Sequence, residues 1–420
     1  QLPTDNEHLD SQWQITKTIS DAVNLANTYP KGPVHVNIPL REPFYPNESI
    51  NYSKDLRIIK TTTAEQTLPS SSVDELTNEL KDYSKILIVA GQGNYDPILA
   101  QNIEKWETPV ISEVISNLPQ TTYSITTHDK FLSSSTADYQ PDLVISFGLS
   151  VLSKPLKTQL RTHKPIAHWH IQEKGNIAPD TFQSLTRVIN CDTSDFFKQL
   201  VPKKHNKSWV TLWLQAEKNA QSTIERLLIN MDFCEFKTLK IVTDHLPKQS
   251  KLHLANSMTV RYANYYPPKN NIQVFANRGT SGIDGSTSTC IGVSMSDETK
   301  LNVLFSGDLS FFYDQNALWN NYIGNNLRIV IFNNHGGGIF RMINGPAKQK
   351  ELEANFVVEQ KLTAELTAKQ HNLAYYSATT EKELTEILNT FFKTTDSSAI
   401  LEIETSGIKN TQLFNAFKQL

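Results

Sequence analysis

Short continuous runs of apolar residues recur through residues 71–202, and helix-like stretches separate several of them. The clearest run, Ile86-Leu-Ile-Val89, ends at a Gly-Gln-Gly turn. Strands that are apolar along their whole length and alternate with helices are typical of parallel sheets covered on both faces. The pattern therefore predicts a doubly wound parallel-sheet domain, of the α/β class, over 71–202. Its predicted strands lie at 86–89, 109–111, 142–147, 166–169 and 188–190.

A second stretch with the same alternation follows a polar, Trp-bearing helical connection at 203–235. Amphipathic spacing of apolar residues predicts helices near 362–371 and 381–392, between the last two strands. We therefore expect a second α/β domain over 203–420. Its predicted strands lie at 272–275, 303–305, 328–332 and 400–403.

The first 45 residues show one helical rhythm and one alternating segment. Apolar residues from Ile15 to Ala26 recur at helical spacing until Pro30, and 33–39 alternates apolar and polar residues as a strand does. A helix and a strand are too little for a domain, so we expect 1–45 to be the last αβ unit of a domain whose earlier part precedes Gln1. Residues 46–70 show no periodicity and are interpreted as a linker.

Composition and charge argue against two classes of protein, those that span a membrane and those that bind nucleic acid. The 420 residues carry 40 Lys+Arg against 43 Asp+Glu, a formal charge of −3, and no apolar run approaches the length of about 18 residues that a membrane span needs. The balance of charge argues against proteins that bind nucleic acid through a basic field. Three widely spaced cysteines form no CxxC pair, which favours a reducing compartment, and we expect the cytoplasm.

Two weak signals lie in the predicted middle domain. Gly91-Gln-Gly93 follows a strand as a dinucleotide-binding turn does, but it lacks the third glycine, and a tight strand-to-helix turn is the better interpretation. His168 and His170 could lie on one face of a strand as metal ligands, yet no Cys or carboxylate accompanies them nearby.

The strongest local signal joins two segments of the predicted C-terminal domain. Ser306-Gly-Asp-Leu-Ser310 follows one strand directly, and Asn333-Asn-His-Gly-Gly-Gly338 follows the next. Asp308 and Asn334 therefore lie at carboxyl ends of strands, where open α/β sheets bind ligands. A carboxylate, an amide and a turn carbonyl are hard oxygen donors that suit Mg²⁺ beside phosphate oxygens. The alternative is that Asp308 caps a helix and the glycines only form a turn.

Asp308 and Asn334 are separated by 26 positions, and Gly307-Asp308 and Asn333-Asn334 at this spacing resemble the GD…NN signature of thiamine-diphosphate enzymes. Three blocks, 276–285, 307–318 and 333–340, are similar to those of the 2-succinyl-5-enolpyruvyl-6-hydroxy-3-cyclohexene-1-carboxylate synthase family, which serves menaquinone biosynthesis. Residues 32–39 and 42–45 also resemble the end of that family's pyrimidine-binding domain. The resemblance implies that 1–45 is the remnant of that domain, 71–202 the middle domain and 203–420 the diphosphate-binding domain.

The resemblance also implies a role for particular residues. The metal, Mg²⁺ or Mn²⁺, would be held by Asp308, Asn334 and the carbonyl of Gly336. Thiamine diphosphate would contact Ile283, Leu309 and Ser310. The substrates would contact Ser257, Arg261, Arg278 and Phe340.

The residue types agree with these roles. Ser257 and Arg261 are four positions apart in a helical stretch and share a face, and arginine forks bind carboxylates in pairs. Surface salt bridges are the alternative for the two arginines. For Ile283 and Phe340, core packing is as good an interpretation as pocket lining.

The resemblance implies thiamine-diphosphate-dependent decarboxylation of 2-oxoglutarate and 1,4-addition of the succinyl unit to isochorismate. It also implies a homodimer or homotetramer with active sites between subunits. In this family the activating glutamate lies in the pyrimidine-binding domain, so we assign it to no residue here and expect the 420-residue chain alone to be inactive. Two alternatives remain: another decarboxylase or carboligase, similar to acetolactate synthase, or a non-catalytic fragment that binds cofactor or oligomerises.

Overall fold

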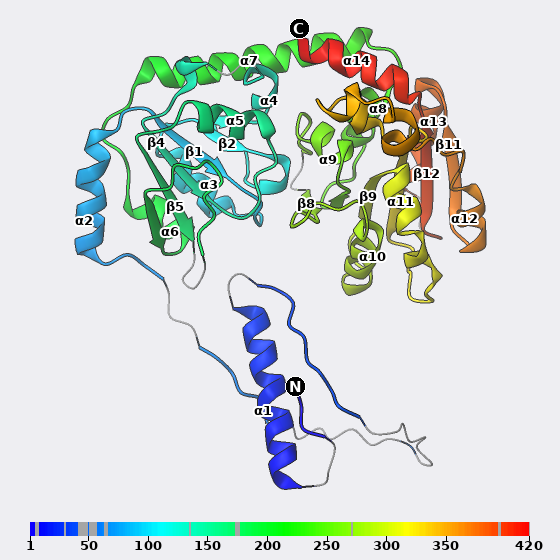
Figure 1. Cartoon of the computed structure of the whole chain (residues 1–420), viewed down its shortest axis with the longest axis horizontal. Coiled ribbons are helices and arrows are strands. Elements are labelled where there is room, and N and C mark those ends of the chain that lie inside the picture. Colours follow the sequence, from blue (N-terminus) through cyan, green and yellow to red (C-terminus); the bar gives the residue numbers. More distant parts are fainter. Residues whose placement is uncertain are drawn as a thin grey trace.

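The computed structural model describes residues 1–4, 8–28, 31–40, 49, 57–62, 66–133, 136–172, 177–269, 272–393 and 396–419. These residues form two six-stranded sheets, each entirely parallel and each flanked by helices (Figure 1). The α/β fold class predicted from the apolar runs is confirmed.

The first sheet has the strand order β3-β2-β1-β4-β5-β6. Side chains of β1 alternate between two cores, because Ile86 and Ile88 pack on one face and Leu87 and Val89 on the other. Both faces are therefore covered, which explains why the strand is apolar throughout. The strands are β1 Ile86–Ala90, β2 Val110–Ser112, β3 Ser124–Ile125, β4 Leu143–Phe147, β5 Ala167–Gln172 and β6 Arg187–Asn190.

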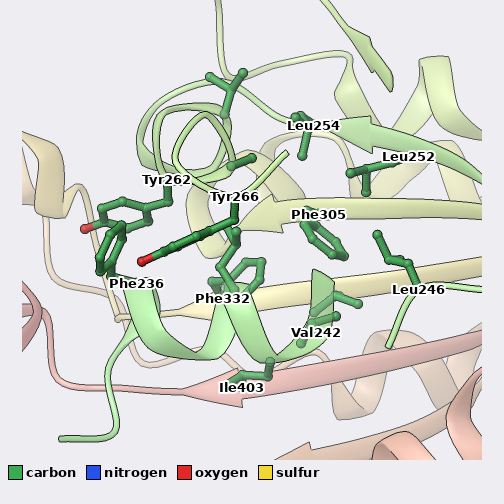
Figure 2. Close-up of a cluster of buried hydrophobic side chains, with 14 of the residues drawn as sticks. Phe236, Val242, Leu246, Leu252, Leu254, Tyr262, Tyr266, Phe305, Phe332 and Ile403 are labelled. Carbon is green, nitrogen blue, oxygen red and sulfur yellow. The ribbon is translucent and has the colours of Figure 1, made fainter. Parts of the chain in front are cut away.

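The second sheet has the order β11-β12-β10-β9-β7-β8. It shows the same alternation, since Val303 and Phe305 of β9 enter one core and Leu304 the other. Aromatic and aliphatic side chains from α8, α9 and the strands β7, β9, β10 and β12 contribute to the larger core (Figure 2). The strands are β7 Lys251–Leu254, β8 Gln273–Ala276, β9 Asn302–Gly307, β10 Leu327–Asn333, β11 Ala374–Ala378 and β12 Ala399–Glu404.

Helices connect the strands of both sheets. In and beside the first sheet they are α2 Ser70–Glu79, α3 Pro97–Glu104, α4 His128–Phe131, α5 Lys154–Thr162 and α6 Thr193–Gln199. In and beside the second they are α8 Glu235–Asp244, α9 Met258–Ala263, α10 Ser286–Ser296, α11 Asp308–Tyr313, α12 Glu365–Gln370, α13 Glu381–Phe391 and α14 Gly407–Gln419. Short 3-10 turns are η1 Leu80–Asp82, η2 Val114–Ser116, η3 Ala137–Tyr139, η4 Gln315–Trp319, η5 Gly338–Arg341 and η6 Pro346–Lys348, and Leu352–Val357 is a π-helix, η7.

The long helix α7, Lys207–Asn230, spans both domains (Figure 1). Its first half places Trp209 and Trp213 in the core behind the first sheet. Its second half places Ile224 in the core of the second sheet. The domain boundary proposed at residue 203 thus falls just before a helix that belongs to both cores.

Loops of the middle domain cover the open edge of the second sheet at β8. The side chain of Asn117 accepts a hydrogen bond from the Val274 N–H at 2.7 Å and donates to the Val274 carbonyl at 2.9 Å. Gln92 donates to the Ala276 carbonyl at 2.9 Å. These amides take the place of a seventh strand, and they hold the two domains together at an edge that would otherwise be exposed.

We expect Asn117→Ala to lower the free energy of unfolding by about 3 kcal/mol. Two hydrogen bonds to β8 are lost, at about 1 kcal/mol each, and alanine fits the φ of 55° at this position poorly, at a further cost of about 1 kcal/mol. Urea titration measures the loss. Asn372→Ala is the matched control, because Asn372 has the same φ of 55° but is exposed and lies outside this contact, so only the backbone cost is expected. Equal losses in the two variants would contradict the inter-domain role.

The glycines at the end of β1 serve close backbone packing. A Cβ at Gly91 would lie 2.6 Å from the Leu149 carbonyl oxygen, and the Gly91 N–H donates to the Phe147 carbonyl at 2.8 Å. The crevice at the middle of this sheet is therefore occupied by the chain itself, which supports the tight-turn interpretation. His168 and His170 share the hydroxyl of Ser146, and no cluster of three or more His, Cys, Asp or Glu side chains within the described ranges could hold a metal.

A buried histidine of β7 makes the stability of the second domain sensitive to acid. His253 is 3% exposed, stacks on Phe275 and lies 3.1 Å from the Asn302 side-chain oxygen. Burial lowers the pKa of His253 to about 4. The unfolded chain, with an ordinary histidine pKa near 6.5, therefore takes up a proton more readily as the pH falls below that value.

We expect this histidine to remove about 2 kcal/mol of unfolding free energy between pH 7 and pH 5. His253→Gln can still donate to Asn302 but does not titrate. Between pH 7 and pH 5 the free energy of unfolding of this variant should therefore fall by about 2 kcal/mol less than that of the original protein. Urea unfolding of both proteins at pH 7 and pH 5 provides the comparison. Parallel pH dependence in the two proteins would show that His253 is not the acid-sensitive group.

The N-terminal segment lies apart from both sheets (Figure 1). Its predicted helix is confirmed as α1, Leu9–Asn27. The strand predicted at 33–39 is wrong, because residues 31–40 form neither helix nor strand. Among the described residues, the backbone of 33–39 takes part in one backbone hydrogen bond, from the Leu2 N–H to the Asn37 carbonyl. An alternating pattern becomes a strand only beside a neighbouring strand, and the described residues of this segment provide none. Part of the predicted linker at 46–70, and residues 42–45, lie outside the described residues.

Among the described residues no helix is long and apolar enough to cross a membrane. The three cysteines, Cys191, Cys234 and Cys290, are buried and unpaired.

Candidate functional site

The candidate site lies at the carboxyl edge of the second sheet. The order β10-β9-β7-β8 places the ends of four strands side by side. After β7 the chain forms β8 on one side of that strand and then crosses to form β9 on its other side, so the strand order changes direction between β7 and β9. Such a switch point is where open α/β sheets bind ligands. Asn334 follows β10, Asp308 follows β9, and Ser257 and Arg278 come shortly after β7 and β8. The topology thus gathers side chains from four segments at one edge.

Asp308 is the first residue of α11 and is 2% exposed. Its Oδ2 accepts a hydrogen bond from the Gln360 amide at 2.8 Å. Burial raises the pKa of Asp308, while hydrogen bonds from Gln360 and from the backbone N–H groups of Leu309 and Gly336 lower it. A carboxylate buried with neutral donors and a raised pKa gains from a cation, since a positive charge offsets the cost of burial.

Asn334 provides the second oxygen. Its Nδ2 donates to the Glu235 carboxylate at 3.2 Å, whereas its Oδ1 is buried and has no hydrogen-bond partner among the described residues. A buried carbonyl oxygen without a partner is costly unless a ligand completes it. Together with the Asp308 carboxylate, this oxygen fits a hard divalent cation, and the donor set therefore agrees with Mg²⁺.

The glycine turn after Asn334 lies beside Asp308, because the Gly336 N–H donates to the Asp308 carboxylate. His335 has a φ of 61° and Gly336 a φ of 155°, and a Cβ on Gly336 would lie 2.8 Å from the Val357 carbonyl oxygen. The Gly336 carbonyl accepts from the Gly338 N–H at 3.0 Å, which leaves it a second lone pair. His335 Nε2 lies 3.6 Å from the Glu404 carboxylate, a neighbour that local sequence did not indicate.

Two residues at the site were not predicted from the sequence. Gln360 contacts Asp308 and also donates to the Asn333 side-chain oxygen at 3.1 Å. Glu235, the first residue of α8, is 3% exposed and contacts Asn334. Burial and then the charge of Asp308 raise the pKa of Glu235 to about 8, against the lowering effect of the Asn334 hydrogen bond. Neither residue belongs to a local motif, so no signal in the sequence marked them.

Three of the four predicted substrate residues, Ser257, Arg261 and Arg278, lie near one another where the two domains meet. Arg261 donates to the Ser257 carbonyl, and Arg278 donates to the Asn256 side-chain oxygen at 2.5 Å. Burial and then the charge of Arg278 lower the pKa of Arg261, which places the two guanidinium groups within electrostatic reach of each other. The Nε of Arg278 is buried without a hydrogen-bond partner among the described residues. Two like charges with an unsatisfied donor form a site for an anion.

The middle domain contributes carboxylates to this cationic pair. The charge of Asp129 raises the pKa of Arg261 and that of Glu113 raises the pKa of Arg278, each against the larger effect of burial. Glu113 accepts the backbone N–H of Ser153 at 2.6 Å and the N–H of Leu152. The arginine pair is therefore partly neutralised from the other domain.

The predicted cofactor residues also approach one another. The Ser310 hydroxyl donates to the Ile283 carbonyl, which joins α11 to the loop after β8. Asn256 fixes that loop by donating to the Gly282 carbonyl at 2.7 Å. Leu309 follows Asp308 and is partly exposed. Phe340, in η5, lies with its ring 5.6 Å from that of Phe356 and against Gly337, so the structure places it beside the glycine turn.

Family models match both sheet domains. Residues 66–254 match the family described as the middle domain of thiamine pyrophosphate enzymes, and residues 255–403 match the C-terminal TPP-binding domain of the same enzymes.

Similar proteins cover almost the whole chain. A 2-succinyl-5-enolpyruvyl-6-hydroxy-3-cyclohexene-1-carboxylate synthase of Cytophaga hutchinsonii is 42% identical over 100% of this chain and 76% of its own length. The chain belongs to this synthase family. Synthases of the same name from Flavobacterium psychrophilum and Porphyromonas gingivalis are 38% and 33% identical, over 96% and 97% of this chain and 74% and 73% of their own lengths. The chain is thus similar to about three quarters of each relative, and the family resemblance seen in the sequence is confirmed.

Proposed function

We propose that the chain provides the diphosphate, metal and substrate contacts for decarboxylation of 2-oxoglutarate and 1,4-addition of the succinyl unit to isochorismate, a step of menaquinone biosynthesis. The observation that carries the proposal is the pairing of buried Asp308 with the unpartnered Oδ1 of Asn334 at the ends of neighbouring strands. Membership of the synthase family supports the particular reaction.

In this proposal Asp308, Asn334 and the Gly336 carbonyl would hold Mg²⁺ or Mn²⁺, which would supply positive charge for the diphosphate. Leu309 and Ser310, in the first turn of α11, and Ile283, whose carbonyl accepts from the Ser310 hydroxyl, would contact thiamine diphosphate. When bound, the cofactor supplies the electron sink that allows a 2-oxo acid to lose carbon dioxide. The chain's own contribution is binding and orientation.

Arg261 and Arg278 bind substrate carboxylates, with Ser257 and Phe340 beside them. The two guanidinium groups suit acids with two carboxylates, because Asp129 and Glu113 offset their charge only in part and a monoacid brings one anionic group to two cations. 2-Oxoglutarate carries two carboxylates, as does isochorismate, whereas pyruvate carries one. The arginine pair therefore favours this family's substrates over those of enzymes similar to acetolactate synthase.

Binding of substrate acids tests the proposal without turnover. The chain loaded with thiamine diphosphate and Mg²⁺ is titrated with 2-oxoglutarate and with pyruvate in a calorimeter. We expect 2-oxoglutarate to bind at least about tenfold more tightly, and Arg278→Ala to remove most of that difference, since a hydrogen bond to a charged group contributes about 1.5–3 kcal/mol. Equal affinity for the two acids, or a preference for pyruvate, would overturn the proposed substrate.

Turnover is a separate question. We assign the activating glutamate to no residue of this chain, and we propose that complete sites form between subunits of a homodimer or homotetramer in the cytoplasm. The 420-residue chain alone is therefore expected to release no carbon dioxide from 2-oxoglutarate. Addition of the quarter of the Cytophaga relative that is not matched by this chain is the experiment that tests for complementation.

A further inference from the structure

Glu235 contacts the proposed metal ligand Asn334 from the side opposite the open oxygen. Its Oε2 accepts from the Asn334 amide at 3.2 Å and from the Asn410 amide at 3.4 Å. Its backbone N–H donates to the Asn410 side-chain oxygen at 3.0 Å. Glu235 is 3% exposed, so water does not compete for these contacts.

The chemistry of the two groups fixes how the Asn334 amide is turned. An amide side chain has one accepting oxygen and one donating nitrogen. Oε2 of Glu235 accepts from two amides, Asn334 and Asn410, so it serves as an acceptor whether the acid is ionised or carries a proton on Oε1. The nitrogen of Asn334 must therefore face Glu235, and Oδ1 is left to face away from it. Gly338 lies beside the same amide, since a Cβ at that position would be 3.5–3.7 Å from it.

Glu235 is itself held in place by the core. The next residue, Phe236, lies among the rings of Tyr262, Tyr266 and Phe414, with centroid distances of 4.9–5.3 Å, and Figure 2 shows Phe236 at the start of α8. Asn410 of α14 donates to the Thr405 hydroxyl at 2.9 Å, which ties the contact to the end of β12. Glu235 and Asn410 are therefore both held in place by these contacts.

We propose that Glu235 is a positioning residue that orients the Asn334 carboxamide, so that its Oδ1 is presented to the divalent metal before the metal binds. The inference rests on the proposed metal site. Residues that orient metal ligands through hydrogen bonds commonly contribute 10–100-fold to metal affinity. Glu235 acts here as a fixed hydrogen-bond acceptor.

Binding of Mn²⁺ in the presence of thiamine diphosphate, measured by the loss of free-ion EPR signal, tests the proposal. Glu235→Ala is expected to weaken Mn²⁺ binding about 10–100-fold. Glu235→Gln keeps an acceptor for the Asn334 amide and is expected to stay within about threefold of the original affinity. If the glutamine and alanine variants lose the same amount, the orienting role is wrong.

Glu217→Ala controls for a purely structural effect. Glu217 is a carboxylate 5% exposed in α7 that accepts from Thr126 and Thr127 and lies outside the site. The Glu217→Ala variant is expected to unfold at a lower temperature while its Mn²⁺ affinity stays unchanged. If its Mn²⁺ binding is also weakened, general destabilisation explains the effect of Glu235→Ala and the positioning role is wrong.

Asp308→Asn separates this inference from the proposed function. If Asp308→Asn weakens Mn²⁺ binding while Glu235→Ala does not, only the positioning role fails. If Asp308→Asn also leaves the affinity unchanged, the metal site itself is wrong.

Discussion

Asp308→Asn is expected to weaken Mg²⁺-dependent binding of thiamine diphosphate by more than about 100-fold, because even residues that only orient metal ligands contribute about 10–100-fold. Asp308 provides the only charge among the three proposed ligands, and its carboxylate is 2% exposed at the end of β9. Equilibrium dialysis of the cofactor at several Mg²⁺ concentrations measures the loss. We expect no loss of stability in the metal-free variant, because the substitution removes a carboxylate whose pKa is raised by burial.

Asp314→Asn is the matched control at the other end of α11. Its carboxylate is 6% exposed and accepts from the Ser288 backbone N–H at 2.7 Å and the Ser288 hydroxyl at 2.6 Å. This variant is expected to lose about 1–2 kcal/mol of stability while binding cofactor normally. The two aspartates thus separate a ligand from a structural cap. Unchanged cofactor binding in Asp308→Asn would confirm the alternative interpretation, in which Asp308 only caps its helix.

The alternation of apolar runs and helices was enough to predict both domains. Strands such as β1 and β10 are apolar on both faces because a core lies on each side, and that makes them visible without alignment. β7 and β11 were missed because Lys251–Leu254 and Ala374–Ala378 mix polar and apolar residues. Their positions follow from pairing with β9 and β12, which is information that a local pattern does not contain.

The segment at 33–39 shows the opposite error. Its alternation is as regular as that of a real strand, yet no neighbouring strand lies beside it in the described residues. Local pattern gives the propensity of a segment for extended structure, whereas hydrogen bonding to a partner decides whether a strand forms.

Only part of the candidate site could be predicted. Asp308 and Asn334 follow two strands that pair directly, so their proximity follows from the rule that carboxyl ends of parallel strands share one edge. Glu235 comes from a helix far earlier in the chain and Gln360 from a loop after the glycine turn. Their contacts with Asn334 and Asp308 depend on the packing of α8 and of that loop, which periodicity does not reveal.

The helix that joins the domains is the basis of the largest stability effect that we expect. Trp213 of α7 is fully buried and its ring lies among those of Trp209, Phe131 and Tyr139, at centroid distances of 5.0–5.8 Å. Trp213→Ala is expected to lower the free energy of unfolding by about 3–5 kcal/mol, the usual cost of such a cavity. Urea unfolding followed by circular dichroism measures the change.

Two further variants test whether the cavity is the cause. Trp213→Phe fills most of the space and removes an indole N–H that has no hydrogen-bond partner among the described residues, so it should cost less than about 1.5 kcal/mol. Trp319→Ala makes the same truncation at a side chain that is 76% exposed and should change stability by less than about 0.5 kcal/mol. Neither Trp213 nor Trp319 belongs to the proposed metal site, so Mg²⁺-dependent cofactor binding should remain normal in all three variants below the unfolding transition. A loss of cofactor affinity in folded Trp213→Ala would show instead that α7 transmits the packing of the middle domain to the site.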